Sequence, residues 1–375
     1  MDKYNKEKYI NLNKYKKIDY RLLIVILFLS LIGLTFVYSA SNIVGKENYN
    51  DSFYFFKRQG IFLIISYFLM YFIVKFDITK LEKYVSFIFI LCLILLLLVL
   101  IPGIGSVRGG ARSWISLFGF SIQPSEFMKV GLLLLYSKYL KDNYNDLKTF
   151  KSFLMLFSVS IIIFLIIMLQ PDFGTGLVIV ISSLLLIFIT GVPYKYFGFI
   201  MLIGLLGISV LIISAPYRID RILAFINPWE DPLGSGFQGI QSLFAITPGG
   251  LLGHGFNNSI QKHFFLPEPQ NDFIFAIVLE EIGLIGGGFI LLLYFYIIYK
   301  GAKISMQVDN NFIKFLSVGI VISLATQVFI NIGVVVGLLP VTGITLPMFS
   351  YGGSSLLITM IQMGLLVSSS KYIVN

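Results

Sequence analysis

The chain has 375 residues, of which 57% are hydrophobic and only 13% are charged, with a mean hydropathy of +0.87. Soluble domains carry about a quarter charged residues, so this composition excludes an ordinary soluble protein and is typical of a chain embedded in a bilayer. The net charge of +9 would suit a nucleic-acid-binding protein, but the positions of the charges along the chain argue against that class.

Residues 1–21 form a basic N-terminal segment, and the apolar stretch 22–40 follows it. This stretch is long enough to cross a bilayer, so we interpret it as a retained signal anchor and not as a cleaved signal peptide. Further stretches of spanning length follow at roughly 60–75, 84–101, 124–140, 153–170, 174–191, 195–215, 273–299, 312–339 and 345–370. We therefore predict an all-α, polytopic membrane protein whose single domain, residues 22–375, contains about ten transmembrane helices.

The distribution of lysine and arginine predicts how this chain is oriented. An even number of spans places both termini on one side, and that side carries 19 of the 28 Lys and Arg residues. The opposite side carries 8, and Lys129 lies inside a predicted span. Basic loops are retained in the cytoplasm, so both termini are expected there and no nucleic-acid partner is expected.

The longest outer segment is residues 216–272, between predicted helices 7 and 8. Connections of this length are usually functional or disordered. We expect an ordered loop, because Phe225, Trp229, Phe237 and Phe244 are spaced as in short amphipathic helices.

The functional prediction centres on residues 264–288, where this loop enters a helix. Pro267 and Pro269 restrict the backbone of their neighbours, so we expect an extended, stiff segment that leads to Asp272. Two interpretations of Asp272 are open. It caps the helix and complements its dipole, or it is a carboxylate held at the membrane surface for chemistry on a lipid-linked substrate. Glu280 and Glu281 lie about two turns further along the same helix.

Other ionisable side chains lie near the outer ends of predicted helices. Glu126 and Lys129 share a helix face, and they form either a self-neutralising pair that helps insertion or part of a polar cavity. Asp172 lies at another outer helix end. We expect these groups to converge in a polar cavity that opens outward, with arginines near the same surface, namely Arg58, Arg112, Arg218 and Arg221.

Competing kinds of site have little support in the sequence. The only histidines, His254 and His263, lie nine residues apart and have no third ligand at a recognisable spacing. The chain has no nucleophile elbow, no P-loop and no dinucleotide-binding fingerprint. We therefore assign no metal ligands from the sequence.

Several motifs, in chain order, resemble those of the shape, elongation, division and sporulation (SEDS) family. The chain is similar to this family along nearly its whole length, with only the first 20 residues outside the match, and it is closer to the division and sporulation branch than to the elongation branch. The matching motifs are Tyr38–Ser41, Gly110–Trp114, QPSEFMK at 123–129, QPDFGTG at 170–176, NPWEDPLGSGFQGIQSLFAI at 227–246, LPEPQNDFIFA at 266–276 and PMFSYGGSS at 347–355.

The resemblance implies a ten-helix glycosyltransferase that polymerises lipid II, an undecaprenyl-pyrophosphate-linked disaccharide peptide, into peptidoglycan strands. It places this activity at the outer face of the bacterial cytoplasmic membrane and implies a class B penicillin-binding transpeptidase as partner. The essential aspartate of the family falls on Asp272, and residues of its polar cavity fall on Arg112, Glu126, Lys129 and Asp172. We add Arg58, Trp114, Arg218 and Glu268 as candidate substrate-binding residues. Asn271 stands where the family usually has Thr, and Ser113 where a second Arg is common.

A chemical outline follows from this resemblance. The acceptor hydroxyl needs a general base, for which a carboxylate is suitable. The departing pyrophosphate needs positive charge, which arginine and lysine or a divalent cation such as Mg²⁺ or Mn²⁺ can supply. Two alternatives stay open. One is a transporter or flippase of lipid-linked precursors, whose ion or substrate sites would use Glu126, Lys129, Glu280 and Glu281, and the other is a scaffold without catalysis that recruits a transpeptidase.

Overall fold

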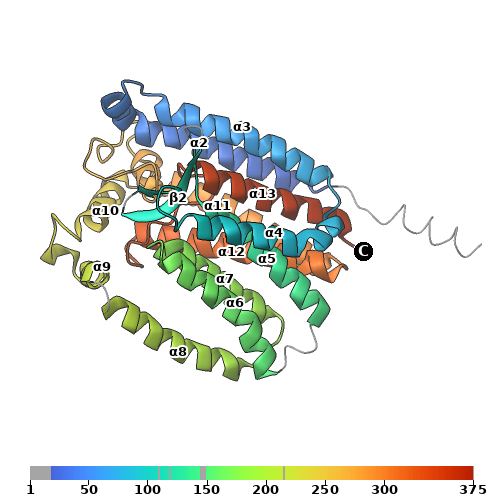
Figure 1. Ribbon diagram of the computed structural model, residues 1–375. Coiled ribbons are helices and arrows are strands. Elements are labelled where there is room, and N and C mark those ends of the chain that lie inside the picture. The colour runs from blue at the N-terminus through green and yellow to red at the C-terminus, as the bar shows by residue number, and fades with distance from the viewer. Residues whose placement is uncertain (1–17, 109, 118–119, 144–148, 214–215, 375) are drawn as a thin grey trace, which may run out of the picture.

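The structure is a computed structural model that describes residues 18–108, 110–117, 120–143, 149–213 and 216–374. Its long helices run side by side as a bundle (Figure 1), and each coincides with one of the predicted apolar stretches. They are α2 (Tyr20–Tyr49), α3 (Tyr54–Lys75), α4 (Leu81–Leu98), α5 (Pro124–Asn143), α6 (Phe150–Met168), α7 (Phe173–Ile189), α8 (Tyr194–Ile213), α11 (Ile274–Gln307), α12 (Asn311–Val335) and α13 (Gly353–Ser369).

Within the described ranges, 7 of these helices are long and apolar enough to cross a membrane, α4 together with the short helix η1 (Ile78–Lys80) that precedes it. Helices α7 and α8 are apolar but offer shorter apolar lengths, and α5 carries several charged residues. The prediction of an all-α membrane protein is confirmed at this level, whereas the number of ten spans stays a prediction.

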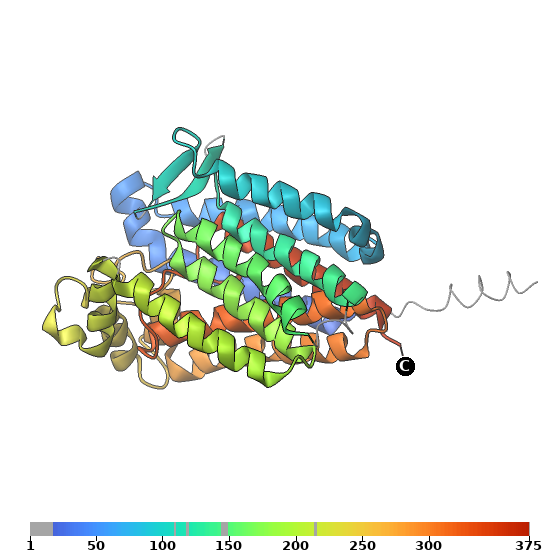
Figure 2. The ribbon, with the colours of Figure 1, turned by 60° about the horizontal axis from the view of Figure 1, so that its bottom comes forward.

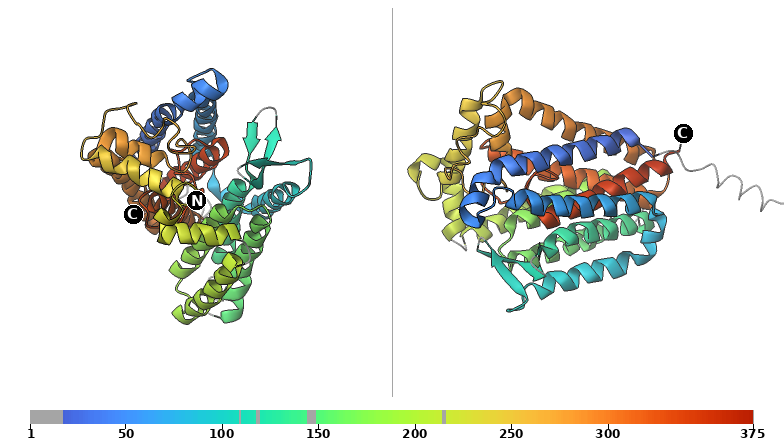
Figure 3. Two further views of the ribbon diagram at one scale, coloured as in Figure 1. Left: turned by 90° about the vertical axis from the view of Figure 1, so that its left-hand side faces the viewer. Right: turned by 90° about the horizontal axis from the view of Figure 1, so that it is seen from above.

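Helix α12 lies at the centre of the bundle, where it packs against α5, α7, α11 and α13. Its side chains are apolar on nearly every face, as expected for a helix that is surrounded by others. The end-on view in Figure 3 shows the remaining helices grouped around this centre. Polar side chains on α12 are therefore buried and need partners within the protein.

The two ends of the described chain meet at one end of the bundle. The backbone N–H of Asp19, just before α2, donates to Ser370 Oγ at 3.0 Å, just after α13. Asp19 Oδ2 also lies 3.3 Å from Lys300 Nζ near the end of α11. Helices α9 (Pro216–Ile226) and α10 (Phe237–Gly249) occupy the opposite end of the bundle (Figure 1).

The long outer loop is ordered, as predicted: it contains α9, the short helix η3 (Pro228–Glu230) and α10. A small antiparallel sheet between α4 and α5 was not predicted (Figure 2). Its strands are β1 (Gly105–Arg108), β2 (Ala111–Leu117) and β3 (Phe120–Ile122), with Ser106 opposite Trp114 and Ser116 opposite Ser121. The glycines of this stretch indicate turns in the sequence, and Gly110, with φ 81°, follows the end of β1.

Helix α11 is interrupted at Gly283, whose backbone angles are φ 64° and ψ −171°. The outer loop inserts its backbone at this interruption. The N–H of Leu284 donates to Gly250 O at 2.9 Å, and the N–H of His254 donates to Glu280 O at 3.0 Å. The sequence predicts an uninterrupted helix here, because Gly283 stands within an apolar run that has no proline.

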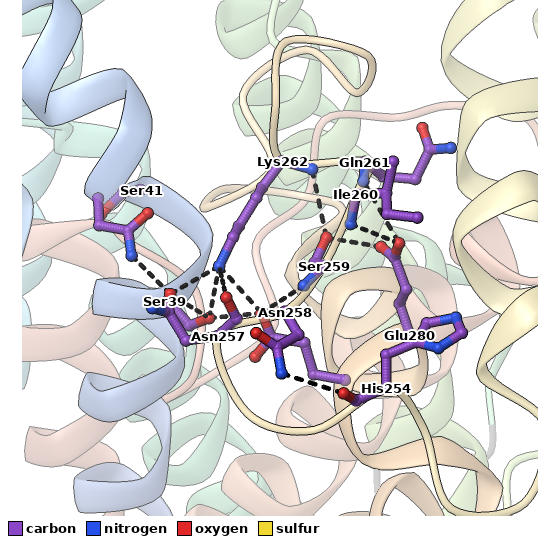
Figure 4. A network of polar contacts seen from close by, with 12 residues as sticks. Ser39, Ser41, His254, Asn257, Asn258, Ser259, Ile260, Gln261, Lys262 and Glu280 are labelled. Atoms are coloured by element: carbon purple, nitrogen blue, oxygen red, sulfur yellow. Dashed lines mark hydrogen bonds and ion pairs between the residues drawn. The ribbon is translucent and has the colours of Figure 1, made fainter.

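The Glu280 carboxylate fastens the loop to α11 (Figure 4). Glu280 is fully buried and accepts hydrogen bonds from Ser259 Oγ at 2.6 Å, from Ile260 N at 2.7 Å and from Gln261 N at 3.3 Å. Three donors on one loop segment satisfy a carboxylate that has no access to water.

The Glu281 carboxylate joins the same loop to α2. Its Oε1 atom accepts from Ser39 Oγ at 2.6 Å and lies 3.3 Å from Lys262 Nζ. Lys262 is itself almost fully buried and donates to Asn257 O at 2.7 Å. Figure 4 shows the contacts of its ammonium group. Two of the carboxylates that the transporter alternative would use, Glu280 and Glu281, therefore have partners in the loop.

Gly283→Ala is expected to destabilise the protein strongly. A Cβ atom there would lie 2.4 Å from the backbone of Leu251, and the φ value is one that alanine rarely adopts. The backbone strain alone costs about 1–3 kcal/mol. We expect a clear fall of the melting temperature in detergent.

Gly288→Ala on the same helix is the matched control, because nothing lies within 4 Å of its added Cβ. It should be neutral or stabilising by up to about 1 kcal/mol, since alanine favours the helix. Equal melting temperatures for the two variants would show that the interruption at Gly283 is not required.

Candidate functional site

Asp272 lies two residues before α11 and does not cap it. The helix begins at Ile274, its N-cap is Phe273, and no side chain makes a capping hydrogen bond. The capping interpretation of Asp272 is therefore wrong. Its carboxylate receives no hydrogen bond from another described residue.

The approach to Asp272 is a series of turns and not the extended segment that we predicted. Phe264 and Glu268 have positive φ values of 67° and 45°. The N–H of Leu266 donates to Gln261 O at 2.9 Å, and that of Asn271 donates to Glu268 O at 3.0 Å. These short-range hydrogen bonds outweigh the preference for extended backbone before a proline.

Backbone contacts hold this turn segment against the end of the bundle. Asn331 Nδ2 on α12 donates to Asp272 O at 2.7 Å, and the N–H of Tyr351 donates to Gln270 O at 2.8 Å. A Cβ atom added to Gly343 would lie 3.8 Å from Asp272 Oδ2, so this glycine leaves room beside the carboxylate. The backbone of Asp272 is thus fixed while its carboxylate is left without a partner in the described chain.

The pKa of Asp272 is raised from 3.8 to about 6, with burial as the largest cause. The neighbouring Glu268 carboxylate raises the pKa as well, whereas the backbone of Asp272 itself and the Arg221 guanidinium lower it. A carboxylate with a pKa near the working pH is suited to accept a proton.

A groove of about 380 Å³ lies in the outer loops beside this segment. Arg221 lines it and donates from Nη1 to Val341 O at 3.2 Å. The sequence had placed Arg221 near this surface without selecting it as a site residue. The candidate Arg218 lies on the same helix α9, but its side chain is outside the described residues. The other residues that line the groove are Asp220, Leu233, Gly234, Ser235, Phe237, Gln238 and Pro267.

Glu126 and Lys129 form a buried ion pair, with 2.8 Å between Oε2 and Nζ. Their side chains are only 6% and 5% exposed, so the pair is shielded from water. Lys129 Nζ also donates to Gln327 Oε1 on α12 at 2.8 Å. Glu126 Oε2 has no hydrogen bond of good geometry within the described chain, so the lysine is its main compensation.

Asp172 is the N-cap of α7 and also binds the start of α5. Its Oδ1 accepts from Thr175 N at 3.2 Å. Its Oδ2 accepts from Gln123 Nε2 at 2.8 Å and from Ser125 Oγ at 3.2 Å. The structure therefore brings Asp172 next to the helix end that carries Glu126 and Lys129, as the sequence predicted.

The remaining candidates occupy the same end of the bundle as Asp272. Arg58 lies on α3 with its guanidinium 4.6 Å from the centre of the Tyr54 ring. Arg112 and Trp114 lie on β2, and the carbonyl of Trp114 accepts from Ser106 Oγ. Glu268 accepts from Asn271 Nδ2 at 2.6 Å and is the candidate closest in sequence to Asp272.

These features define a membrane-embedded helical bundle with a polar site at one end, and comparison with known proteins places it in a family. The cell cycle protein family of FtsW, RodA and SpoVE matches residues 20–374. The chain belongs to this family, which is the SEDS family that the motifs indicate. It is a multi-pass membrane protein.

Individual relatives support this assignment. The chain is 49% identical to stage V sporulation protein E of Bacillus subtilis over 355 residues, which cover 94% of this chain and 97% of that protein. It is 39% identical to a protein named probable peptidoglycan glycosyltransferase FtsW of Geobacter metallireducens, with 96% of each chain covered. The resemblance to the division and sporulation branch is confirmed.

Solved structures share the fold. One belongs to a study of polymerization and crosslinking by a peptidoglycan synthase complex, with 28% identity, a TM-score of 0.73 and coverage of 95% of this chain and 98% of that chain. A mutant of the rod shape determining protein RodA of Thermus thermophilus is 25% identical, with a TM-score of 0.69 and coverage of 96% and 99%.

The raised pKa of Asp272 leads to a pH prediction. A base must be ionised, so the rate of lipid II polymerisation should fall about tenfold between pH 7 and pH 5. Glu268→Gln removes a negative neighbour and should shift the midpoint to lower pH, whereas Arg221→Gln should shift it to higher pH. Rate profiles of the three proteins measure this, and shifts in the opposite directions would contradict the assignment.

The buried ion pair leads to a second prediction, on stability. Lys129→Met strands Glu126 without a partner and should cost on the order of 3–5 kcal/mol. Glu126→Gln should cost less, because Lys129 keeps its hydrogen bond to Gln327. Since the double variant leaves no stranded charge, its loss should be smaller than the sum of the single losses.

Melting temperatures of the four proteins complete this double-mutant cycle. The exposed pair Lys57–Asp51, with 2.7 Å between its charged atoms, is the control, and its coupling should be no more than about 1 kcal/mol. Additive losses for Glu126 and Lys129 would refute the mutual dependence.

Proposed function

We propose that this chain is a peptidoglycan glycosyltransferase that polymerises lipid II, with Asp272 as the catalytic carboxylate. The observation that carries the catalytic assignment is the carboxylate itself. It neither caps a helix nor receives a hydrogen bond from another described residue, and its pKa is raised to about 6. Membership of the family and the likeness to FtsW and stage V sporulation protein E support the reaction class.

The proposed reaction is a displacement at the anomeric carbon of the donor. The 4-hydroxyl oxygen of the acceptor sugar forms a bond to that carbon while the bond to the pyrophosphate oxygen breaks. The hydroxyl proton passes to the Asp272 carboxylate, and the bond electrons leave with the lipid pyrophosphate. A positioned general base contributes typically 10²–10⁴-fold to such a step.

Cations at the outer end of the bundle are proposed to bind the pyrophosphate. The planar guanidinium of arginine matches phosphate oxygens, and Arg112 on β2 makes no ion pair within the described chain. Arg58 on α3 and Arg221 on α9 lie at the same end of the bundle, and Lys129, although already paired with Glu126, adds positive charge deeper in the bundle. Trp114, Asp172, Glu268 and Arg218 stay proposed contributors to substrate binding.

A divalent cation is compatible with the residues near Asp272. The Glu268 and Asp272 carboxylates are close enough for one charge to raise the pKa of the other, and Mg²⁺ is often bound by one or two carboxylates together with substrate phosphates. These two residues would hold the ion, which would supply positive charge to the departing pyrophosphate.

The setting that we propose is the bacterial cytoplasmic membrane, crossed ten times, with residues 1–21 in the cytoplasm and residues 22–375 as one domain. The loop 216–272 and Asp272 then face outward, where lipid II is polymerised. The structure of a peptidoglycan synthase complex that shares this fold supports a transpeptidase as partner, and we propose a class B penicillin-binding protein.

Asp272→Asn tests the proposal. The neutral amide cannot act as the base, so polymerisation of labelled lipid II should fall by about 10²-fold or more. Because folding raises the pKa of Asp272 from 3.8 to about 6, ionisation disfavours the folded state. The group contributes stability that is fully present below pH 3.8 and is lost as the pH rises through about 6. At pH 7.5 the variant should therefore melt at a higher temperature than the wild type, with a gain of up to about 3 kcal/mol.

Asp51→Asn is the matched control, because Asp51 is a carboxylate in a loop and pairs only with the exposed Lys57 in the described chain. It should keep the wild-type rate. A folded Asp272→Asn protein that polymerises at more than about half the wild-type rate would refute the catalytic assignment. Flipping of lipid II without polymer would instead support the transporter, and neither activity would support the scaffold.

A further inference from the structure

The C-terminal half of α12 carries two buried amide side chains. Gln327 is 4% exposed and Asn331 is 1% exposed. Residues four apart lie on one face of a helix, separated by about 6 Å along its axis. A buried amide costs about 1–3 kcal/mol unless it is hydrogen-bonded. The hydrogen-bond partners of these two side chains therefore indicate what the amides do.

Asn331 joins the start of α11 to the segment before α13. Its Nδ2 donates to Asp272 O and to Ile344 O, each at 2.7 Å. Asp272 and Ile344 are more than seventy residues apart in the sequence. One side chain therefore sets where the backbone of Asp272 lies relative to the segment that faces it.

Gln327 makes the corresponding contacts one turn further into the bundle. Its Oε1 accepts from Lys129 Nζ at 2.8 Å, and its Nε2 donates to Thr345 O at 3.0 Å. Lys129 is in turn paired with Glu126. The two amides thus connect the two parts of the site to neighbouring residues of one chain segment.

That segment, residues 341–345, is called here the connecting segment. The side chains of Arg221, Gln327 and Asn331 donate to its carbonyl groups at Val341, Thr345 and Ile344. Within it Gly343 has a φ of 75° and lies beside Asp272 Oδ2. The two amides therefore bind this irregular backbone just after the glycine that faces the carboxylate, and the Arg221 guanidinium binds it just before.

We propose that Asn331 is a positioning residue for Asp272 and that Gln327 is a positioning residue for Lys129. Helix α12, through these two amides, sets the distance between the base and the cationic part of the site. The inference rests on the proposed function, because it takes Asp272 as the base and Lys129 as part of substrate binding.

Asn331→Leu tests the first half. With the donor lost, the Asp272 backbone is free to shift, and a misplacement of about 1 Å can cost about 10²-fold in rate. We expect kcat for lipid II polymerisation to fall by at least about tenfold, with KM changed by less than about twofold. The pH midpoint of the rate should move to lower pH, because a looser carboxylate is better hydrated.

Gln327→Leu tests the second half of the proposal. This variant should change KM and leave kcat nearly unchanged, the reverse of Asn331→Leu. Lys129 loses its partner on α12, so KM should rise by about tenfold, while kcat and the pH midpoint stay within about twofold and at the wild-type value. If these residues served only to stabilise the fold, their variants would not change kcat and KM in these two different ways.

Gln362→Leu is the matched control. Gln362 is a buried glutamine on α13, 5% exposed, and no described hydrogen bond joins it to the site. Its amide nitrogen has no hydrogen-bond partner in the described chain, so the variant should fold and keep the wild-type kcat, KM and pH midpoint. If Asn331→Leu does not accumulate in folded form, Asn331→Ala removes the same donor without added bulk or charge and is judged by the same measurements.

Two results would overturn the inference: Asn331 variants with the kinetics and pH profile of Gln362→Leu, or Gln327→Leu with an unchanged KM. The failure of the proposed function is distinguishable, because it appears as polymerisation by folded Asp272→Asn. If that variant is inactive while the Asn331 and Gln327 variants match the control, only the positioning roles are refuted.

Discussion

The outer loop binds α11 at the interruption of that helix, and the other segments at the outer end of the bundle depend on this contact. In a bilayer an unsatisfied backbone group costs several kcal/mol, so a helix can be interrupted only where other groups satisfy it. The carbonyl of Gly250 and the N–H of His254 do this at Gly283, and Glu280 binds three donors of the same loop. Because the loop is held there, the turns that lead to Asp272 begin from a segment whose position is fixed.

Carboxylates of similar sequence context have different roles because their surroundings differ. Glu280 and Glu281 are fully buried, yet loop donors and Lys262 compensate their charges. The Asp272 carboxylate has no such donors, so its burial raises its pKa. This is the arrangement expected where one carboxylate is structural and another exchanges protons. The stability given up at Asp272 is what leaves it able to react.

Much of the fold could be predicted from the sequence, because apolar stretches of spanning length have few alternatives in a bilayer. Asp272 could be proposed through the family motif and its position at a helix entrance. The small sheet and the break at Gly283 could not, since both depend on backbone contacts between segments distant in the sequence. The turns before Asp272 were predicted as extended because Pro267 and Pro269 favour that conformation, whereas the structure closes them through Leu266 and Asn271.

The amides of α12 are a further feature whose role could not be predicted from the sequence but follows from the structure. Gln327 and Asn331 stand in an apolar span at a spacing of four, which signals a shared helix face but names no partner. Their partners lie elsewhere in the chain, Lys129 on α5 and Asp272 just before α11, and each amide also binds the connecting segment. Polar groups in the interior of a membrane protein are costly, so each must satisfy another group. In the folded bundle, Gln327 and Asn331 meet that requirement by binding Lys129 and the backbone of Asp272. They therefore link the ion pair to the proposed base.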